Sequence, residues 1–296
     1  MICDSHTHFI PEAICERSNF YKGIWHDRES YFSFLDSNYI EKALLVYPST
    51  DAGRKLKSSG EEADIYNREI GLFLKSSPRI VAACLPDLDN IGNCADKLAR
   101  LKEKGFRAIN LASSLKGRFL IKELVPLFEA AQRLDLPIFV HPQTMNPLGF
   151  ERVKDPLLMP VLEYTFDESM FLGLLMTEEI LQNFKIKFIF SSLGGVTPFL
   201  KERFDRVYLM LKQRGIVKDL HGLPSEIFKR VFVDTSGASL SAVKMAIDLF
   251  GPDHVLWGSD YPVHPCLEKN IASFDTLGKE VKEKLIHSNF KNIFPD

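Results

Sequence analysis

The sequence lacks the features that mark secreted, disulfide-bonded and membrane-spanning proteins. It has five cysteines but no Cys-x-x-Cys pair, which argues against both a disulfide framework and a thiolate zinc site. No run approaches the about 18 apolar residues of a membrane span, and the first residues contain no signal-peptide pattern. We therefore expect a cytoplasmic protein with no membrane partner.

An excess of one charge is lacking too. Lys and Arg number 37 against 39 Asp and Glu, a formal net charge of -2, so the chain has no basic surface for nucleic acid. No linker rich in Pro, Gly or Ser divides the 296 residues, of which 45% are hydrophobic, enough for a large core. We predict one domain over residues 1–296 that acts on a small molecule.

Short apolar runs alternate with longer segments of helical period, as in consecutive βα units on a parallel sheet. Eight runs begin near residues 2, 43, 80, 107, 138, 186, 231 and 255. Runs such as Lys187-Phe188-Ile189-Phe190 are apolar on both faces, which fits strands covered outside and packed inside. This pattern predicts a (β/α)8 TIM barrel. The segment 155–183 is longer and more apolar, and we interpret it as an elaborated connection after the fifth strand with extra helix; the alternative is that its apolar residues are ordinary core packing.

Polar residues with catalytic chemistry follow several of these runs. His6 and His8 are two residues apart in the first strand, so their side chains point to the same face. His141, Ser192 and Asp260 follow later strands, and the carboxyl ends of all barrel strands meet at one mouth. Three imidazoles and one carboxylate suit zinc or another divalent transition metal, with a position left for water or substrate.

The motifs at these strand ends resemble those of the amidohydrolase superfamily, in particular its branch related to aminocarboxymuconate semialdehyde decarboxylase. The matching segments are Asp4-Ser5-His6-Thr7-His8, Phe139-Val140-His141-Pro142, Ser192-Leu193-Gly194-Gly195, Val233-Asp234-Thr235 and Gly258-Ser259-Asp260-Tyr261-Pro262. The resemblance implies that His6, His8, His141 and Asp260 bind a single divalent metal, usually zinc. It also implies a metal-dependent hydrolase or decarboxylase that acts on a small, carboxylated substrate; the sequence does not separate these two reactions.

One residue departs from the family pattern. The related enzymes have an acid/base histidine before the glycine turn after the sixth strand, whereas this chain has Ser192, and a hydroxyl does not hold a proton near neutral pH as imidazole does. We expect Ser192 to contribute a hydrogen bond and Asp260 to take the proton, with His221 and His264 as weaker candidates. The rival hypothesis is a non-catalytic or weakened barrel that binds metal or ligand after losing this histidine.

Arg203 follows Ser192 by eleven positions. The resemblance implies that an arginine at this spacing enters the neighbouring subunit of a homodimer and binds a substrate carboxylate, for which the planar guanidinium is suited. The alternative is a solvated arginine on a helix surface. Asp234 and Asn289 are expected to stabilise turns. Three aromatic residues either line the pocket or only pack near it: Phe9, Trp25 and Tyr261.

Overall fold

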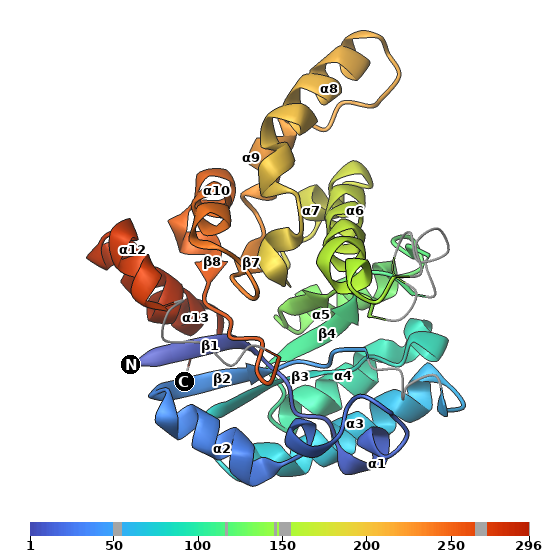
Figure 1. Cartoon of the computed structure of the whole chain (residues 1–296). Coiled ribbons are helices and arrows are strands. Elements are labelled where there is room, and N and C mark those ends of the chain that lie inside the picture. Colours follow the sequence, from blue (N-terminus) through green and yellow to red (C-terminus); the bar gives the residue numbers. More distant parts are fainter. Residues whose placement is uncertain (50–54, 116–117, 145–146, 148–154, 264–270, 296) are drawn as a thin grey trace.

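Eight parallel strands form a barrel in sequence order, from β1 to β8 (Figure 1). The computed structural model describes residues 1–49, 55–115, 118–144, 147, 155–263 and 271–295. The strands are β1 Ile2–Thr7, β2 Ile40–Leu45, β3 Ile80–Cys84, β4 Ala108–Ala112, β5 Ile138–His141, β6 Phe188–Phe190, β7 Phe232–Asp234 and β8 Val255–Leu256. The last strand returns to the first, because the backbone N–H of Ser5 donates to the carbonyl of Trp257 at 2.9 Å. The predicted (β/α)8 barrel is confirmed.

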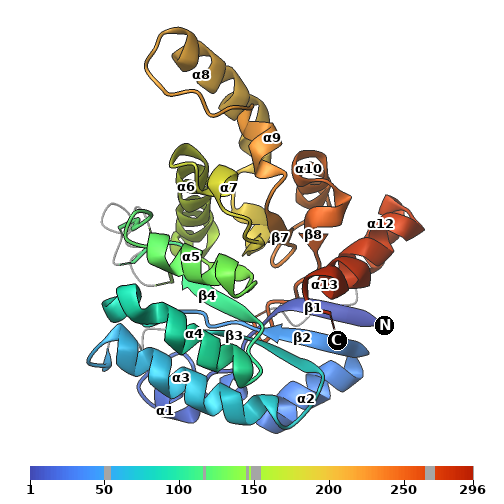
Figure 2. The ribbon, with the colours of Figure 1, turned by 180° about the vertical axis from the view of Figure 1, so that it is seen from behind.

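Helices surround these strands on the outside (Figures 1 and 2). The helices are α1 Glu12–Cys15, α2 Arg28–Ser37, α3 Ser59–Leu74, α4 Cys94–Glu103, α5 Val125–Arg133, α6 Tyr164–Thr177, α7 Ile180–Asn183, α8 Lys201–Gln213, α9 Pro224–Phe228, α10 Leu240–Phe250, α12 Lys279–Glu283 and α13 Asn289–Ile293. Within the described part of the chain, no helix has both the length and the apolar character needed to cross a membrane.

The strands are apolar on both faces because each face meets a different part of the core. In β6, Ile189 belongs to the cluster inside the barrel, whereas Phe188 and Phe190 belong to the larger cluster between strands and helices. Phe290 and Phe294, in and after α13, join the inner cluster. Each fully buried side chain of this size contributes about 1.5–3 kcal/mol to stability. This packing holds the strand ends, and the polar residues that follow them, in fixed positions at the mouth.

The connection after β5 contains α6, preceded by a π-helical turn at Met159–Glu163. The predicted extra helix is therefore present. The alternative, core packing, holds for only part of the segment: Phe171, Leu172 and Leu175 are buried, whereas Val161, Phe166 and Met170 are exposed. One side of α6 meets the barrel, and residues 166 and 170, one turn apart, lie on the other side.

Helix α8 extends away from the barrel (Figures 1 and 2). Its outer side and the segment after it expose large apolar side chains, with Leu209 52% and Ile216 64% accessible. Exposed apolar side chains grouped on one projection are typical of an interaction surface rather than of a solvated helix.

Candidate metal centre

Strands β1 and β5 bring three histidines together at the mouth of the barrel. His6 and His8 are buried, and their Nε2 atoms lie 3.2 Å apart. His141 is the last residue of β5, and one ring nitrogen of each histidine lies within 4.8 Å of those of the other two. The structure thus unites three of the residues that the sequence motifs singled out.

The Asp260 carboxylate joins this cluster from the loop after β8. Its Oδ1 atom lies 3.1 Å from Nε2 of His8 and 3.6 Å from Nε2 of His6. Two donors each about 2.1 Å from one zinc ion in a tetrahedral arrangement lie roughly 3.4 Å apart, so these spacings fit a shared ion. Gly258 permits the approach of this loop, because a Cβ atom there would lie 2.9 Å from Cβ of His6.

Each of the three imidazoles has an acceptor for its other nitrogen. Nδ1 of His6 faces Oδ2 of Asp234 at 2.8 Å, Nδ1 of His8 faces the Val46 carbonyl at 2.9 Å, and Nδ1 of His141 faces the Pro142 carbonyl at 2.9 Å. When each Nδ1 donates a hydrogen bond, the lone pair remains on Nε2, which is the usual arrangement of metal-bound histidine. The donor set therefore fits a divalent transition metal.

The electrostatics of the cluster also suit metal binding. Burial lowers the pKa of His8. Burial, together with the nearby His8 and His6, also holds the pKa of His141 well below its usual range. Burial also disfavours the charged form of His6, but Asp234 outweighs it and raises the pKa of His6. Burial opposes ionisation of Asp260, yet the hydrogen bond with His8 and the charges of the histidines lower its pKa to about 2. The lowered pKa values of His8 and His141 favour neutral imidazoles, and that of Asp260 favours an ionised carboxylate, as metal ligands require; at His6 a bound cation would have to displace the proton that Asp234 favours.

Ser192 lies beside this cluster in a turn fixed by two neighbours. Its backbone N–H donates to Oδ1 of Asp234 at 3.0 Å, and its Oγ atom lies 3.3 Å from Oγ of Ser236. The turn presses against α6 at Gly195, where φ is +68° and a Cβ atom would lie 1.9 Å from the carbonyl oxygen of Thr165. Only glycine fits this position, because a side chain would meet both a steric clash and a left-handed backbone.

Asp234 contacts a histidine of the cluster as well as the turn that the sequence predicted it to stabilise. It stabilises a turn as expected, accepting from the backbone N–H groups of Ser192 and Ser236, and it also orients His6. Its position at the end of a barrel strand was the signal for this role. Asn289 stabilises a turn, with Nδ2 donating to the carbonyls of Pro252 and Val255.

Two buried carboxyl groups were missed altogether. Asp167 and Glu168 lie on α6 and are completely inaccessible to solvent. Oδ1 of Asp167 accepts from the hydroxyl of Ser114 at 2.9 Å, and Oε1 of Glu168 accepts from the hydroxyl of Ser191 at 2.6 Å. The available signal was a pair of acids inside an otherwise apolar segment, since ionisable residues are rarely buried without a specific partner.

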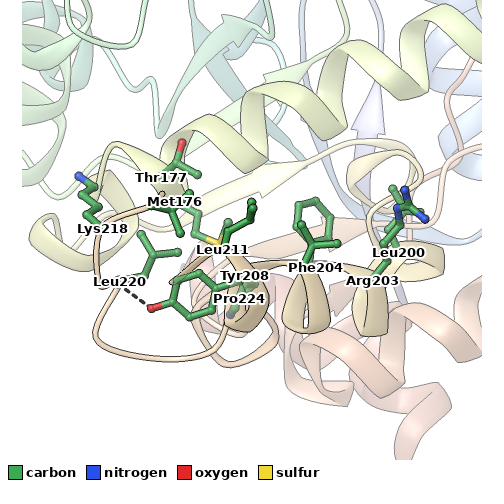
Figure 3. A pocket seen from close by; sticks show the side chains of 12 residues that line it. Met176, Thr177, Leu200, Arg203, Phe204, Tyr208, Leu211, Lys218, Leu220 and Pro224 are labelled. Carbon is green, nitrogen blue, oxygen red and sulfur yellow. Dashed lines mark hydrogen bonds between the residues drawn. The ribbon is translucent and has the colours of Figure 1, made fainter. Parts of the chain in front are cut away.

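The remaining predicted residues lie outside the histidine cluster. Arg203 is exposed and lines an apolar pocket of 460 Å³ formed by α8, the end of α6 and the loop before α9 (Figure 3). His221 is exposed in that loop, and His264 lies outside the described residues. Of the three aromatic residues, Trp25 lies near the cluster, with its ring 5.7 Å from that of His8. The other two pack against aromatic side chains, the Phe9 ring on Phe73 and the Tyr261 ring on Phe34.

Comparisons with known proteins identify the family and the fold of the chain. The family model described as "Amidohydrolase" matches residues 3–294. The decarboxylase macB of Penicillium terrestre is 24% identical over 99% of this chain and 94% of its own length. 5-Carboxyvanillate decarboxylase LigW of Sphingomonas paucimobilis superposes with a TM-score of 0.86 at 19% identity, covering 99% of this chain and 98% of that one. The Novosphingobium aromaticivorans 5-carboxyvanillate decarboxylase, complexed with manganese and 4-hydroxy-3-methoxy-5-nitrobenzoic acid, has a TM-score of 0.81 at 20% identity, covering 99% and 95% of the two chains.

Proposed function

The chain belongs to the amidohydrolase family, as its motifs predicted, and we propose that it is a metal-dependent enzyme that removes a carboxyl group from a small aromatic acid. The observation that carries this proposal is the convergence of His6, His8 and His141 beside Asp260, with each histidine Nδ1 already facing an acceptor. The decarboxylases among the similar proteins support the reaction and the carboxylated aromatic substrate class.

We assign His6, His8, His141 and Asp260 as the ligands of one divalent ion, and we propose zinc because three nitrogen donors and one carboxylate suit it. An ion held there supplies a Lewis acid for a substrate oxygen. Among the side chains, Asp260 accepts a proton from a hydroxyl group of the substrate or from water. Ser192, beside Asp234 and Ser236, donates a hydrogen bond to a substrate oxygen.

We further propose that the enzyme is a homodimer and that Arg203 of one chain binds the substrate carboxylate of the other. The support is the exposed position of Arg203 on α8, together with the apolar side chains that α8 and the following segment expose. Burying such side chains between two copies is the usual way to remove them from water. The planar guanidinium then grips a carboxylate through two hydrogen bonds.

We also propose that residues 1–296 act as one domain in the reducing cytoplasm. Four cysteines of the described residues are free and buried: Cys3, Cys15, Cys84 and Cys94. Burial raises the pKa of Cys3, Cys15 and Cys84 to about 12, which keeps these thiols unreactive.

The test is an assay of carbon dioxide release from 5-carboxyvanillate, 2,6-dihydroxybenzoate and related hydroxylated aromatic acids. We expect turnover by the zinc- or manganese-loaded protein and none after the metal is removed with a chelator. His6→Ala serves as the metal-site control, and His221→Ala, in the exposed loop, is its matched comparison. Hydrolysis of lactones and no decarboxylation would assign the chain to the hydrolytic reaction. A metal-loaded protein that binds aromatic acids and converts none would favour the non-catalytic barrel.

A further inference from the structure

A second group of metal-ligating side chains lies at the opposite end of the barrel from the mouth. Cys3 and Glu41 are the second residues of β1 and β2, and His287 belongs to the π-helical turn Lys284–Ser288 before α13. The thiol of Cys3, one carboxylate oxygen of Glu41 and one ring nitrogen of His287 all lie within 4.8 Å of one another. None of the roles assigned above uses this group.

Two irregularities of the backbone bring these side chains together. The pairing of β1 with β2 shifts by one residue just before Cys3, which leaves Glu41 without a counterpart in β1. Such a bulge changes the direction of the side chain of the extra residue. His287 comes from a π-helical turn, a rare conformation found frequently at functional sites. Helix α13, which follows this turn, lies beside β1 (Figures 1 and 2), so segments from both ends of the chain meet at this group.

Glu41 presents an unpaired oxygen to the group. Its Oε2 atom is buried, and no hydrogen-bond partner for it lies among the described residues. Nε2 of His287 lies 3.4 Å from this oxygen, which is roughly the spacing of two donors on one tetrahedral zinc ion. A buried carboxylate oxygen without a hydrogen bond costs stability, and a bound cation removes that cost.

The other polar atoms of Glu41 and His287 have partners that orient them. Nζ of Lys291 lies 2.9 Å from Oε1 of Glu41 and leaves Oε2 to face the group. Nδ1 of His287 faces Oε1 of Glu283 at 3.2 Å, and the Ser288 hydroxyl donates to the other oxygen of Glu283 at 2.5 Å. A carboxylate behind an imidazole leaves the lone pair of Nε2 free for a cation, as in metal-bound histidine.

The ligand types and their exposure define the cation. Sulfur and imidazole donors favour zinc and similar transition metals over calcium and magnesium, which prefer oxygen. Cys3 is 1% exposed, whereas the side chains of Glu41 and His287 are 27% and 28% exposed. An ion therefore reaches the group from solvent on the side of these two residues, and a water molecule completes its coordination.

We propose that Cys3, Glu41 and His287 bind a second divalent transition metal ion, such as zinc, which joins the first two strands of the barrel to the C-terminal turn. Because catalytic groups of such barrels lie at the mouth and the opposite end serves stability, this ion stabilises the fold and takes no part in the reaction. It binds more weakly than the ion at the mouth, since it has three protein donors instead of four. It also has to displace the thiol proton, because burial raises the pKa of Cys3 to about 12. Dialysis therefore leaves only the ion at the mouth, and the second site fills when metal is added.

Cobalt(II) added to the dialysed, metal-loaded protein tests the proposal, because a bond between cobalt and thiolate sulfur gives a strong charge-transfer band in the near ultraviolet. The four donors assigned at the mouth are nitrogen and oxygen, so the band reports the second site. We expect the band to saturate at one sulfur-bound cobalt ion per chain. The midpoint of thermal unfolding should rise by about 5 °C or more at about 100 times the Kd. A protein without the band at saturating cobalt overturns the proposal.

Cys3→Ser removes the sulfur donor, so the band should disappear while the ion at the mouth remains. Cys15→Ser is the matched control, because Cys15 is also 1% exposed but lies on α1, and it should keep the band. Glu41→Gln and His287→Gln change partly exposed residues and keep the thiol, so they test the site even if the serine variant does not fold. Each should weaken cobalt binding at least about 10-fold.

Three outcomes overturn the ligand assignment: a band that persists in folded Cys3→Ser, a band lost in Cys15→Ser, or an affinity for cobalt that neither Glu41→Gln nor His287→Gln changes. A group that is only a network of ion pairs would give no band, and His287→Gln would then lower stability equally with and without added cobalt. None of these measurements uses turnover, so failure of the proposed decarboxylation leaves their outcome unchanged.

Discussion

Oδ2 of Asp234 forms a hydrogen bond with Nδ1 of His6 at 2.8 Å, although the two residues are 228 positions apart in the sequence. The contact fixes which nitrogen His6 presents to the mouth of the barrel, while the other oxygen of Asp234 accepts from the N–H of Ser192. One carboxylate therefore aligns both a metal-ligand candidate and the turn after the sixth strand. This link explains why changes at residues that do not touch the ion should still alter metal binding.

The first prediction concerns metal content. We expect the purified protein to bind about one divalent ion per chain, because four donors converge on a single point. The double variant His6→Ala/His8→Ala should lose the ion, whereas His221→Ala should keep it. Elemental analysis of the dialysed proteins measures this. Two equivalents in the wild type, or full occupancy of the double variant, would contradict the ligand assignment.

Asp234→Asn should weaken metal binding without abolishing it. Loss of the negative charge reduces the basicity of His6 and removes its preferred acceptor, and such outer partners typically change metal affinity by about 10- to 100-fold. Competition with a chromophoric chelator measures the affinity. Asp248→Asn, which changes an exposed carboxylate on α10, is the control. Equal affinities in the two variants would show that the contact with Asp234 does not tune the site.

The pH dependence of stability should reveal the raised pKa that burial gives Glu168. Its pKa is raised in the folded chain, so above about pH 4.5 the unfolded chain releases this proton while the folded chain retains it, and the free energy of unfolding falls as pH rises. Glu168→Gln removes this pH-dependent contribution to the free energy of unfolding. Its stability relative to wild type should therefore increase with pH, by at most about 1.4 kcal/mol per pH unit. Urea denaturation of both metal-loaded proteins from about pH 5 to about pH 8 measures it; a difference that stays constant would refute the raised pKa.

Arg203 and helix α8 give a prediction about assembly. Leu209→Glu should convert a dimer into a monomer, because it places a charge on an apolar contact surface. Arg203→Ala should raise KM for carboxylated substrates while metal content and dimerisation persist, with Arg206→Ala on the same helix as control. Sedimentation and steady-state kinetics measure the two effects. A wild-type protein that sediments as a monomer at micromolar concentration would exclude an arginine supplied by the partner.

Ser192→His tests the residue that departs from the family pattern. An imidazole at this turn supplies a group able to hold a proton, so Ser192→His should accelerate the reaction, with a gain of up to about 10²-fold for a well-placed ring. The comparison is between the wild type and Ser192→His, at matched metal content. A wild type that already turns over a substrate quickly, and that Ser192→His slows, would mean that the serine belongs to a different, working mechanism.

The sequence by itself determined the barrel and the histidine cluster. Runs with two apolar faces specify strands covered inside and outside, and the two-residue spacing of His6 and His8 places both rings on one side of β1 whatever the rest of the chain does. His141 and Asp260 were also recognisable, since every parallel strand of a barrel delivers the residue at its carboxyl end to the same mouth. Family membership followed from the motifs at these positions.

Only the tertiary structure decided which buried polar groups pair with one another. The pairing of Asp234 with His6 and that of Glu168 with Ser191 join segments 228 and 23 residues apart, and local periodicity contains no information about such contacts. Helix α6 looked like core because its composition is apolar, yet its packing against the sixth-strand turn leaves Phe166 exposed and encloses Glu168. Whether a carboxyl group is ionised or neutral depends on its burial and on nearby charges, and both exist only once the chain has folded.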